Sequence, residues 1–128
     1  MKTVLVNAAL VGSGGFIGAV CRYGMSALVQ RSVALSSFPY GTLLVNLTGC
    51  LLIGIAVGMI DHRQLLSPEL RLFLLVGLLG GFTTYSTFAW ETLSLAKGSG
   101  FVPALTYVTL HIVAGLALAA AGYTLVAR

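Results

Sequence analysis

The charged residues of this chain divide it into four long apolar stretches. Each stretch holds at least 19 consecutive residues without Asp, Glu, Lys or Arg. A bilayer core about 30 Å thick is crossed by about 20 helical residues, because an α-helix rises about 1.5 Å per residue. All four stretches are therefore long enough to cross a membrane. We predict helices near residues 4–30, 39–60, 69–96 and 101–126.

Proline and glycine mark the places where these helices begin and end. Each of the three prolines falls close to a predicted helix start, where a missing N–H costs little. Ser67 directly precedes Pro68 and suits a helix cap, and the glycines at 98 and 100 predict a tight turn. The pattern predicts a single four-helix transmembrane domain over residues 1–128, all-α, with both termini on one side of the membrane.

The third apolar stretch has a polar segment in its middle. Residues 80–88 read Gly-Gly-Phe-Thr-Thr-Tyr-Ser-Thr-Phe, which makes a poor lipid-facing helix. We predict that this helix is broken mid-membrane, with one half ending near Gly80 and the other beginning after Thr84. Non-helical backbone at this depth is tolerated beside protein or a water-filled cavity, and its freed carbonyls can coordinate cations. A continuous helix, with Ser and Thr bonded back to the preceding turn, is the alternative.

Three aromatic residues recur through this segment. Phe82, Tyr85 and Phe88 would form one stripe on a helix, because they are spaced by three residues. The edge of an aromatic ring is electropositive, so ring edges facing a narrow path can contact an anion that has lost its water. Ordinary core packing explains the same spacing and is the alternative.

Several other polar side chains lie within the apolar stretches, where each one needs a partner or a function. Asn46 sits in the middle of the second stretch, and its amide can donate to an anion or to neighbouring backbone. Tyr107 and His111 are spaced to face one groove, and a structural hydrogen bond is the alternative role for the histidine. Arg22 either concentrates anions at an entrance, anchors its helix at the interface or pairs with Glu91.

Glycines four residues apart occur in three of the predicted helices. The pairs are Gly14 and Gly18, Gly54 and Gly58, and Gly77 and Gly81. Such spacing lets helix backbones approach closely and favours assembly. Four packed helices leave no room for an ion path through one copy, so any conduction is expected between subunits.

Positive charge is distributed almost evenly between the two predicted sides. The side of the termini holds Lys2, Arg63, Arg71 and Arg128, and the other side holds Arg31 and Lys97, with Arg22 just inside the membrane. A bias this weak permits both orientations, and hence an antiparallel homodimer. A single orientation set by the small bias is the alternative.

Composition excludes several classes of protein. Hydrophobic residues make up 58% of the chain and charged residues 8%, which rules out a soluble enzyme, a nucleic-acid binder and a disordered tail. The formal charge of +4 suits anchoring at the membrane interface. Cys21 and Cys50 have no ligands at metal spacing, so we expect them to be small buried hydrophobic residues. The acids form no catalytic arrangement, and we expect no enzyme.

Three ordered motifs resemble a known family. They are Gly14-Gly15-x-x-Gly18-Ala19-x-x-Arg22-Tyr23, then Gly41-Thr42-Leu43-x-x-Asn46-x-x-Gly49, then the segment 80–88. In these motifs, in length and in number of spans, the whole chain is similar to the Fluc (CrcB) family of bacterial fluoride channels.

The resemblance implies a dual-topology antiparallel homodimer in the bacterial inner membrane, with two fluoride pores at the subunit interface. It implies a structural Na⁺ at the dimer centre, held by the backbone carbonyls of Gly80 and Thr83. The implied fluoride pathway consists of Asn46, Tyr85, Ser86, Thr87, Phe88 and Tyr107, with Arg22 in the vestibule.

The chain departs from the family pattern at two places. Tyr85 stands where family members usually carry phenylalanine, and its hydroxyl can bond to fluoride, to water or to Asn46. His111 stands where the family often has a small hydroxyl residue. The resemblance implies no role for it.

We therefore expect passive fluoride export that relieves fluoride toxicity. The first alternative is a proton-coupled exporter similar to the small multidrug resistance family. That family relies on a membrane carboxylate in its first helix, which this chain lacks, so Glu91 would have to serve. The second alternative is a non-conducting assembly subunit.

Overall fold

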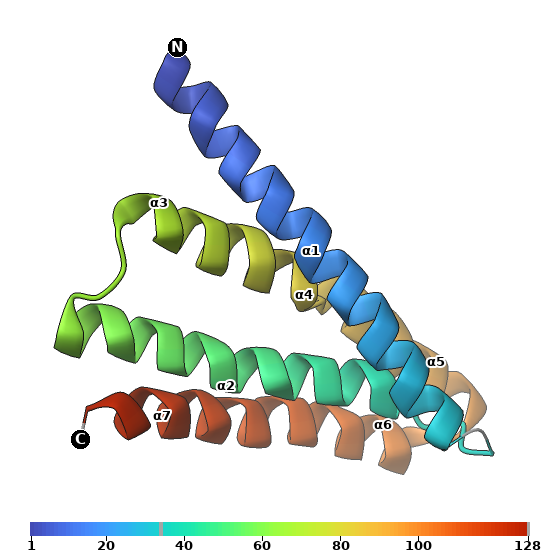
Figure 1. Cartoon of the computed structure of the whole chain (residues 1–128). Coiled ribbons are helices and arrows are strands. Elements are labelled where there is room, and N and C mark those ends of the chain that lie inside the picture. Colours follow the sequence, from blue (N-terminus) through green and yellow to red (C-terminus); the bar gives the residue numbers. More distant parts are fainter. Residues whose placement is uncertain (34, 128) are drawn as a thin grey trace.

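The computed structural model describes residues 1–33 and 35–127, and these residues form four helical rods (Figure 1). The first two rods are α1 (Lys2–Ser32) and α2 (Tyr40–Arg63). The third is built from α3 (Pro68–Arg71), the π-helical η1 (Leu72–Leu79), α4 (Gly80–Phe82) and α5 (Tyr85–Gly98). The fourth is built from α6 (Phe101–Thr109), the π-helical η2 (Leu110–Ala114) and α7 (Gly115–Val126).

Each rod is long and apolar enough to cross a membrane. The four predicted spans are therefore confirmed, with ends that differ by only a few residues from the predicted ones. Among the described residues no β-strand is present. Arg128, counted above with the positive residues, lies outside the described part of the chain.

The local signals in the sequence explain where the rods begin and end. The Ser67 hydroxyl accepts a hydrogen bond from the Leu70 N–H at 3.2 Å, and Pro68 is the first residue of α3. The turn before α6 contains Gly100 with a φ of 97°, a left-handed conformation that glycine adopts without steric cost. α2 ends at Arg63, and the next residue, Gln64, has a φ of 50°.

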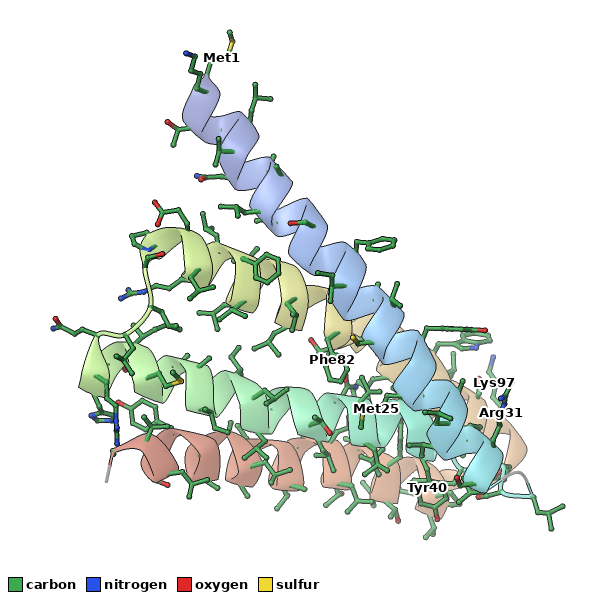
Figure 2. The ribbon with its side chains drawn as sticks, in the orientation of Figure 1. Met1, Met25, Arg31, Tyr40, Phe82 and Lys97 are labelled. Atoms are coloured by element: carbon green, nitrogen blue, oxygen red, sulfur yellow. The ribbon has the colours of Figure 1, made fainter. Side chains whose placement is uncertain are left out.

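The rods run in alternating directions, and α1 lies obliquely across the third rod and against α2 (Figure 1). α2 lies alongside α7, while η1 and α4 lie over α2. Met1 is at the end opposite Arg31 and Lys97 (Figure 2). The C-terminus and the α2–α3 connection lie toward the same end as the N-terminus, as the sequence predicts for the two termini (Figure 1).

The glycine pairs bring helix backbones together within one chain. A Cβ on Gly14 would lie 2.9 Å from the Leu78 amide nitrogen, and one on Gly77 would lie 3.0 Å from the Gly14 Cα. On the other side of the molecule, a Cβ on Gly122 would lie 2.9 Å from the Ile55 amide nitrogen. Small residues are therefore needed where α1 crosses η1 and where α2 meets α7.

One cluster of buried apolar residues lies near the end that holds Arg31 and Lys97. It consists of Leu43, Leu95, Ala104 and Tyr107, with Phe38, Leu47 and Phe88 packed against it. Many other large apolar side chains are exposed on the rods (Figure 2). This surface suits lipid or another protein chain.

The prediction that both cysteines are buried was wrong for one of them. Cys21 is exposed on α1, while Cys50 is partly buried. A helix that is apolar on every face gives no periodic signal to separate its packed side from its lipid side.

Candidate functional site

The third rod leaves helical geometry for two residues. Thr83 has φ −85° and ψ 158°, and Thr84 has φ −141° and ψ 118°, so both are extended between α4 and α5. The first helical half ends at Phe82, two residues beyond the predicted Gly80, and the second half begins at Tyr85. The Thr83 N–H still donates to the Leu79 carbonyl at 3.0 Å, so it is the Thr84 backbone that needs partners outside a regular helix.

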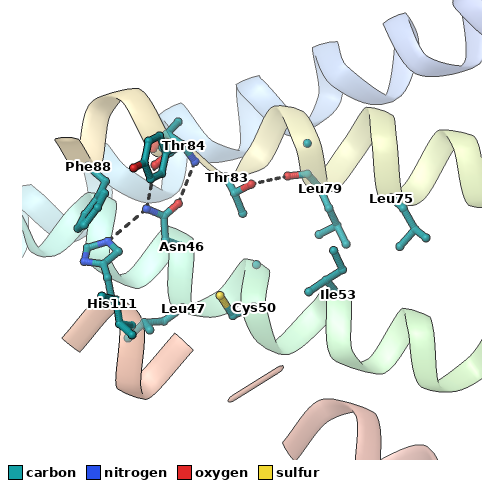
Figure 3. Close-up of a pocket in the computed structure, with 14 residues that line it drawn as sticks. Asn46, Leu47, Cys50, Ile53, Leu75, Leu79, Thr83, Thr84, Phe88 and His111 are labelled. Carbon is teal, nitrogen blue, oxygen red and sulfur yellow. Dashed lines mark hydrogen bonds between the residues drawn. The ribbon is translucent and has the colours of Figure 1, made fainter. Parts of the chain in front are cut away.

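Asn46 supplies both partners for Thr84. The Thr84 N–H donates to Asn46 Oδ1 at 2.9 Å, and Asn46 Nδ2 donates to the Thr84 carbonyl at 3.1 Å (Figure 3). The side chain thus bonds to the extended backbone as a neighbouring strand would. The sequence predicted that Asn46 would contact either an anion or neighbouring backbone, and in the structure it contacts backbone.

The Thr84 contact has a consequence for Gly80. In a continuous α-helix the Gly80 carbonyl would accept a hydrogen bond from the Thr84 N–H, four residues later. Here that N–H donates to Asn46, so it is not available to Gly80. The neighbouring Gly81 carbonyl accepts from Arg22 Nε at 3.1 Å. The break thus removes the α-helical donor of the Gly80 carbonyl, and Arg22 donates to the Gly81 carbonyl.

His111 links Asn46 to the fourth rod. Its Nε2 lies 3.2 Å from Asn46 Nδ2 (Figure 3). Its Nδ1 lies 3.0 Å from the Tyr107 carbonyl. The Tyr107 and His111 rings are 4.4 Å apart between centroids. The two side chains are therefore neighbours, and of the two it is His111 that lines a cavity. His111 lies in η2, and such π-helical turns frequently occur at functional sites.

The carboxylate of Glu91 continues this network, and its partners were not predicted from the sequence. Glu91 accepts from the Tyr107 hydroxyl at 2.7 Å and from the Thr42 hydroxyl at 2.9 Å. The suggested pair between Glu91 and Arg22 does not form, because each has other partners. A signal was available: Thr42 and Asn46 are one turn apart, and so are Tyr107 and His111, which predicts two facing polar stripes.

The aromatic residues do not form the single stripe that a continuous helix would give. Phe82 is buried, whereas Tyr85 is 82% exposed, because the extended residues between them change the helical register. Tyr85 lies 5.9 Å from Phe88 between ring centroids, and Phe88 lies 4.5 Å from His111. Tyr85 and Phe88 therefore share a face.

A cavity of about 440 Å³ lies beside this network (Figure 3). Its walls come from α2, η1, α4, the break, α5 and η2, and they include Asn46, Gly80, Thr83, Tyr85, Phe88 and His111. The cavity therefore brings together three of the residues predicted for the fluoride pathway, Asn46, Tyr85 and Phe88. It also contains Gly80 and Thr83, the two residues whose carbonyl oxygens are expected to coordinate a cation.

The remaining predicted residues lie elsewhere. Arg22 and Thr87 line a second cavity of about 280 Å³, between α1 and the third rod. Tyr107 is fully buried behind Phe88, with its hydroxyl on Glu91. Ser86 is exposed on α5. Within one chain the predicted fluoride pathway is thus divided between two cavities and an exposed face.

The described residues contain no group of three or more His, Cys, Asp or Glu side chains that could hold a metal ion. A cation at this place would therefore need backbone carbonyls as ligands. The Gly80 carbonyl fits that requirement, because the Thr84 N–H, which would donate to it in a continuous α-helix, donates to Asn46 instead.

Comparison with known proteins gives similarity along most of the chain. The family model described as "CrcB-like protein, Camphor Resistance (CrcB)" matches residues 9–123. A protein named fluoride-specific ion channel FluC from Thermus thermophilus is 47% identical over 116 residues, covering 91% of each chain. Proteins of the same name from Nitratidesulfovibrio vulgaris (strain Miyazaki F) and Nautilia profundicola are 43% and 41% identical, over 85% and 88% of this chain and 87% and 88% of their own lengths.

Proposed function

The chain belongs to the CrcB family, and on this premise we propose that it is a channel through which fluoride leaves the cell passively. The family resemblance expected from the three motifs is confirmed. Its members are fluoride ion channels and not enzymes, which agrees with the expectation from the acidic residues. Hydrogen fluoride is neutral and crosses membranes, then ionises in a less acidic interior. A fluoride-selective pore lets the trapped anion leave.

The polar network beside the larger cavity is the observation that carries this proposal. Fluoride is strongly hydrated, so a pore must replace its water with closely spaced donors. Asn46 contributes an amide, and Tyr85 and Phe88 contribute ring edges to the same wall. Polar side chains within a membrane span are rare and commonly mark an ion path.

We further propose that two antiparallel copies complete the pathway. Tyr85 and Ser86 are exposed in a single chain, and the larger cavity is open. A second copy packed on this face would bring Tyr85, Ser86 and Phe88 against a protein wall. The nearly equal positive charge of the two sides favours both orientations.

A Na⁺ at the centre of that dimer is the proposed resident cation. The Gly80 carbonyl, without its helical donor, and the Thr83 carbonyl, in extended backbone, would hold it from each copy. Na⁺ there would neutralise carbonyl dipoles from two copies and add positive potential near the anion path. Arg22 contributes positive charge on the other side of the break, through its bond to Gly81.

Glu91 argues against the proton-coupled exporter. Both of its oxygens accept hydrogen bonds from hydroxyl groups within the same chain. A carboxylate that exchanged protons with substrate would have to break these bonds at every cycle. Organic-cation uptake driven by a proton gradient, and lost in Glu91→Gln, would favour the exporter.

Fluoride efflux from liposomes that contain the purified protein tests the proposed function. We expect efflux well above that of empty liposomes, and no matching efflux of chloride. Tyr85→Phe is expected to conduct also, because it keeps the ring edge and removes only the hydroxyl. The proposal is wrong if neither protein releases fluoride faster than empty liposomes.

A further inference from the structure

The amide of Asn46 has its orientation fixed by the extended backbone of Thr84. A backbone N–H can only donate and a carbonyl can only accept, so Oδ1 must face the Thr84 nitrogen and Nδ2 the Thr84 oxygen. The second N–H of Asn46 Nδ2 is then the one directed at His111 Nε2, 3.2 Å away.

The same reasoning fixes the proton on His111. The Tyr107 carbonyl lies 3.0 Å from Nδ1 and can only accept, so Nδ1 carries the proton. Nε2 then has a free lone pair, and it accepts from Asn46. The imidazole is neutral in this arrangement, and both N–H groups of the Asn46 amide are occupied.

Protonation of His111 would make the Asn46 contact impossible. Nε2 would become a donor, and two donors would face each other across 3.2 Å. The two side chains must then separate, which frees one amide N–H and adds an imidazolium N–H beside it. Both groups border the 440 Å³ cavity, so a small anion can reach them.

We propose that His111 is a proton-sensitive positioning residue, and that fluoride binds between Asn46 Nδ2 and His111 Nε2 when the imidazole is protonated. This inference rests on the proposed function and assigns a role to a residue for which the family resemblance implies none. In the neutral form His111 occupies the amide donor that fluoride needs. In the charged form it releases that donor and contributes a second one, together with a positive charge.

His111 is the group near this contact whose ordinary titration range lies close to neutral pH. The titratable side chains around it are Cys50 on α2, Tyr85 and Glu91 on α5, and Tyr107 on α6. Carboxylates ordinarily lose their proton well below pH 6, and thiols and phenols above pH 8. Between about pH 6 and pH 8, a change in fluoride affinity is therefore assigned to the histidine.

Calorimetric titration of the purified protein with sodium fluoride at about pH 8 and pH 6 tests this proposal. We expect fluoride to bind about tenfold more tightly at pH 6, since proton and anion then favour each other's binding. His111→Gln keeps a hydrogen-bond acceptor for Asn46 but does not titrate, and it is expected to bind fluoride equally at both pH values. Sodium chloride serves as the control salt.

His62→Gln is the matched control variant, because His62 lies at the far end of α2, 4.9 Å from the Tyr123 ring. It is expected to keep the pH dependence of the parent protein. His111→Asn, a second variant that does not titrate, is used if His111→Gln does not fold into the oligomer of the parent, as judged by size-exclusion chromatography.

The outcomes separate this inference from the proposed function. Fluoride affinity that is equal at both pH values, absence of fluoride binding, or a pH dependence that survives in both His111 variants overturns the inference. Efflux from liposomes is measured on the same preparations, with empty liposomes at each pH to subtract the passage of hydrogen fluoride. If the protein conducts fluoride but its affinity for fluoride does not change with pH, the proposed channel function is supported and the proposed role of His111 is wrong.

Discussion

At the scale of single residues, a chain of hydrogen bonds joins three of the four rods. It runs from the Thr42 hydroxyl through Glu91 and the Tyr107 hydroxyl, and then from the Tyr107 carbonyl through His111 to Asn46. Every member has a partner, and among the described residues no buried side-chain polar atom is left without one. In an apolar environment such a satisfied network fixes the geometry of its members.

Tyr107→Phe tests how much this network contributes to the free energy of unfolding. The substitution removes the donor at 2.7 Å from Glu91 and leaves a partly buried carboxylate oxygen unpaired. We expect a loss of about 1–3 kcal/mol in the free energy of unfolding, the range for removing one partner of a buried hydrogen bond. Thermal or denaturant unfolding in detergent measures it.

The control for this variant is Tyr23→Phe, since Tyr23 is 77% exposed on α1. Its stability is expected to stay within about 0.5 kcal/mol of the parent protein, as for most surface substitutions. Equal stability of Tyr107→Phe and Tyr23→Phe would show that the hydroxyl of Tyr107 contributes nothing to the fold.

At the scale of elements, the close crossing of α1 over η1 and α4 depends on glycine. The backbones are near enough that a methyl group on Gly14, Gly77 or Gly81 would meet main-chain atoms of the other helix. Main-chain atoms cannot turn aside as a flexible side chain can. In a membrane, where apolar side chains gain little from leaving lipid, such contact is a principal source of helix association.

Gly14→Ala is therefore expected to weaken the crossing. The new methyl group would lie 2.5 Å from the Phe73 carbonyl oxygen and 2.9 Å from the Leu78 nitrogen, so α1 must move away. We expect a lower midpoint of thermal unfolding, equivalent to about 1–3 kcal/mol for overpacking.

Gly12→Ala provides the control on the same helix. A methyl group there meets no atom within 4 Å, and alanine favours helix more than glycine does. Its stability is expected to equal or exceed that of the parent protein. A similar loss in both variants would mean that α1 responds to the number of its glycines and not to the crossing.

The elements also show what sequence can predict. The four rods follow from the length of the apolar stretches, and the start of α3 follows from Ser67 and Pro68. The pairing of Asn46 with Thr84 could not be predicted, because the two residues are 38 positions apart and Asn46 has several possible partners. Nor could the exposure of Cys21, because hydropathy does not separate the lipid face of an apolar helix from its protein face.

At the scale of the whole molecule, the small core and the wide apolar surface suit a chain that is completed by lipid and by a second copy. If the proposed dual topology is correct, the turn between α5 and α6 lies on one face of the membrane in half of the copies and on the other face in the rest. A cysteine introduced at the exposed Ser99, in a Cys21→Ser, Cys50→Ser background, is expected to react with membrane-impermeant thiol reagents from both faces.

The measurement is labelling of right-side-out and inverted vesicles under matched conditions. Roughly equal fractions are expected from the two faces, because the positive charge hardly distinguishes them. Labelling from only one face would contradict the antiparallel arrangement. It would favour the alternative, in which the small charge bias sets a single orientation.

The two extended threonines have a further consequence, for how the third rod spans the membrane. At 1.5 Å per residue the helical run Pro68–Phe82 rises about 22 Å and α5, with 14 residues, about 21 Å. Neither half alone reaches across a hydrocarbon layer of about 30 Å. Both halves together are therefore needed to span the layer, and the amide of Asn46, which precedes them in the chain, bonds to the Thr84 backbone where they join.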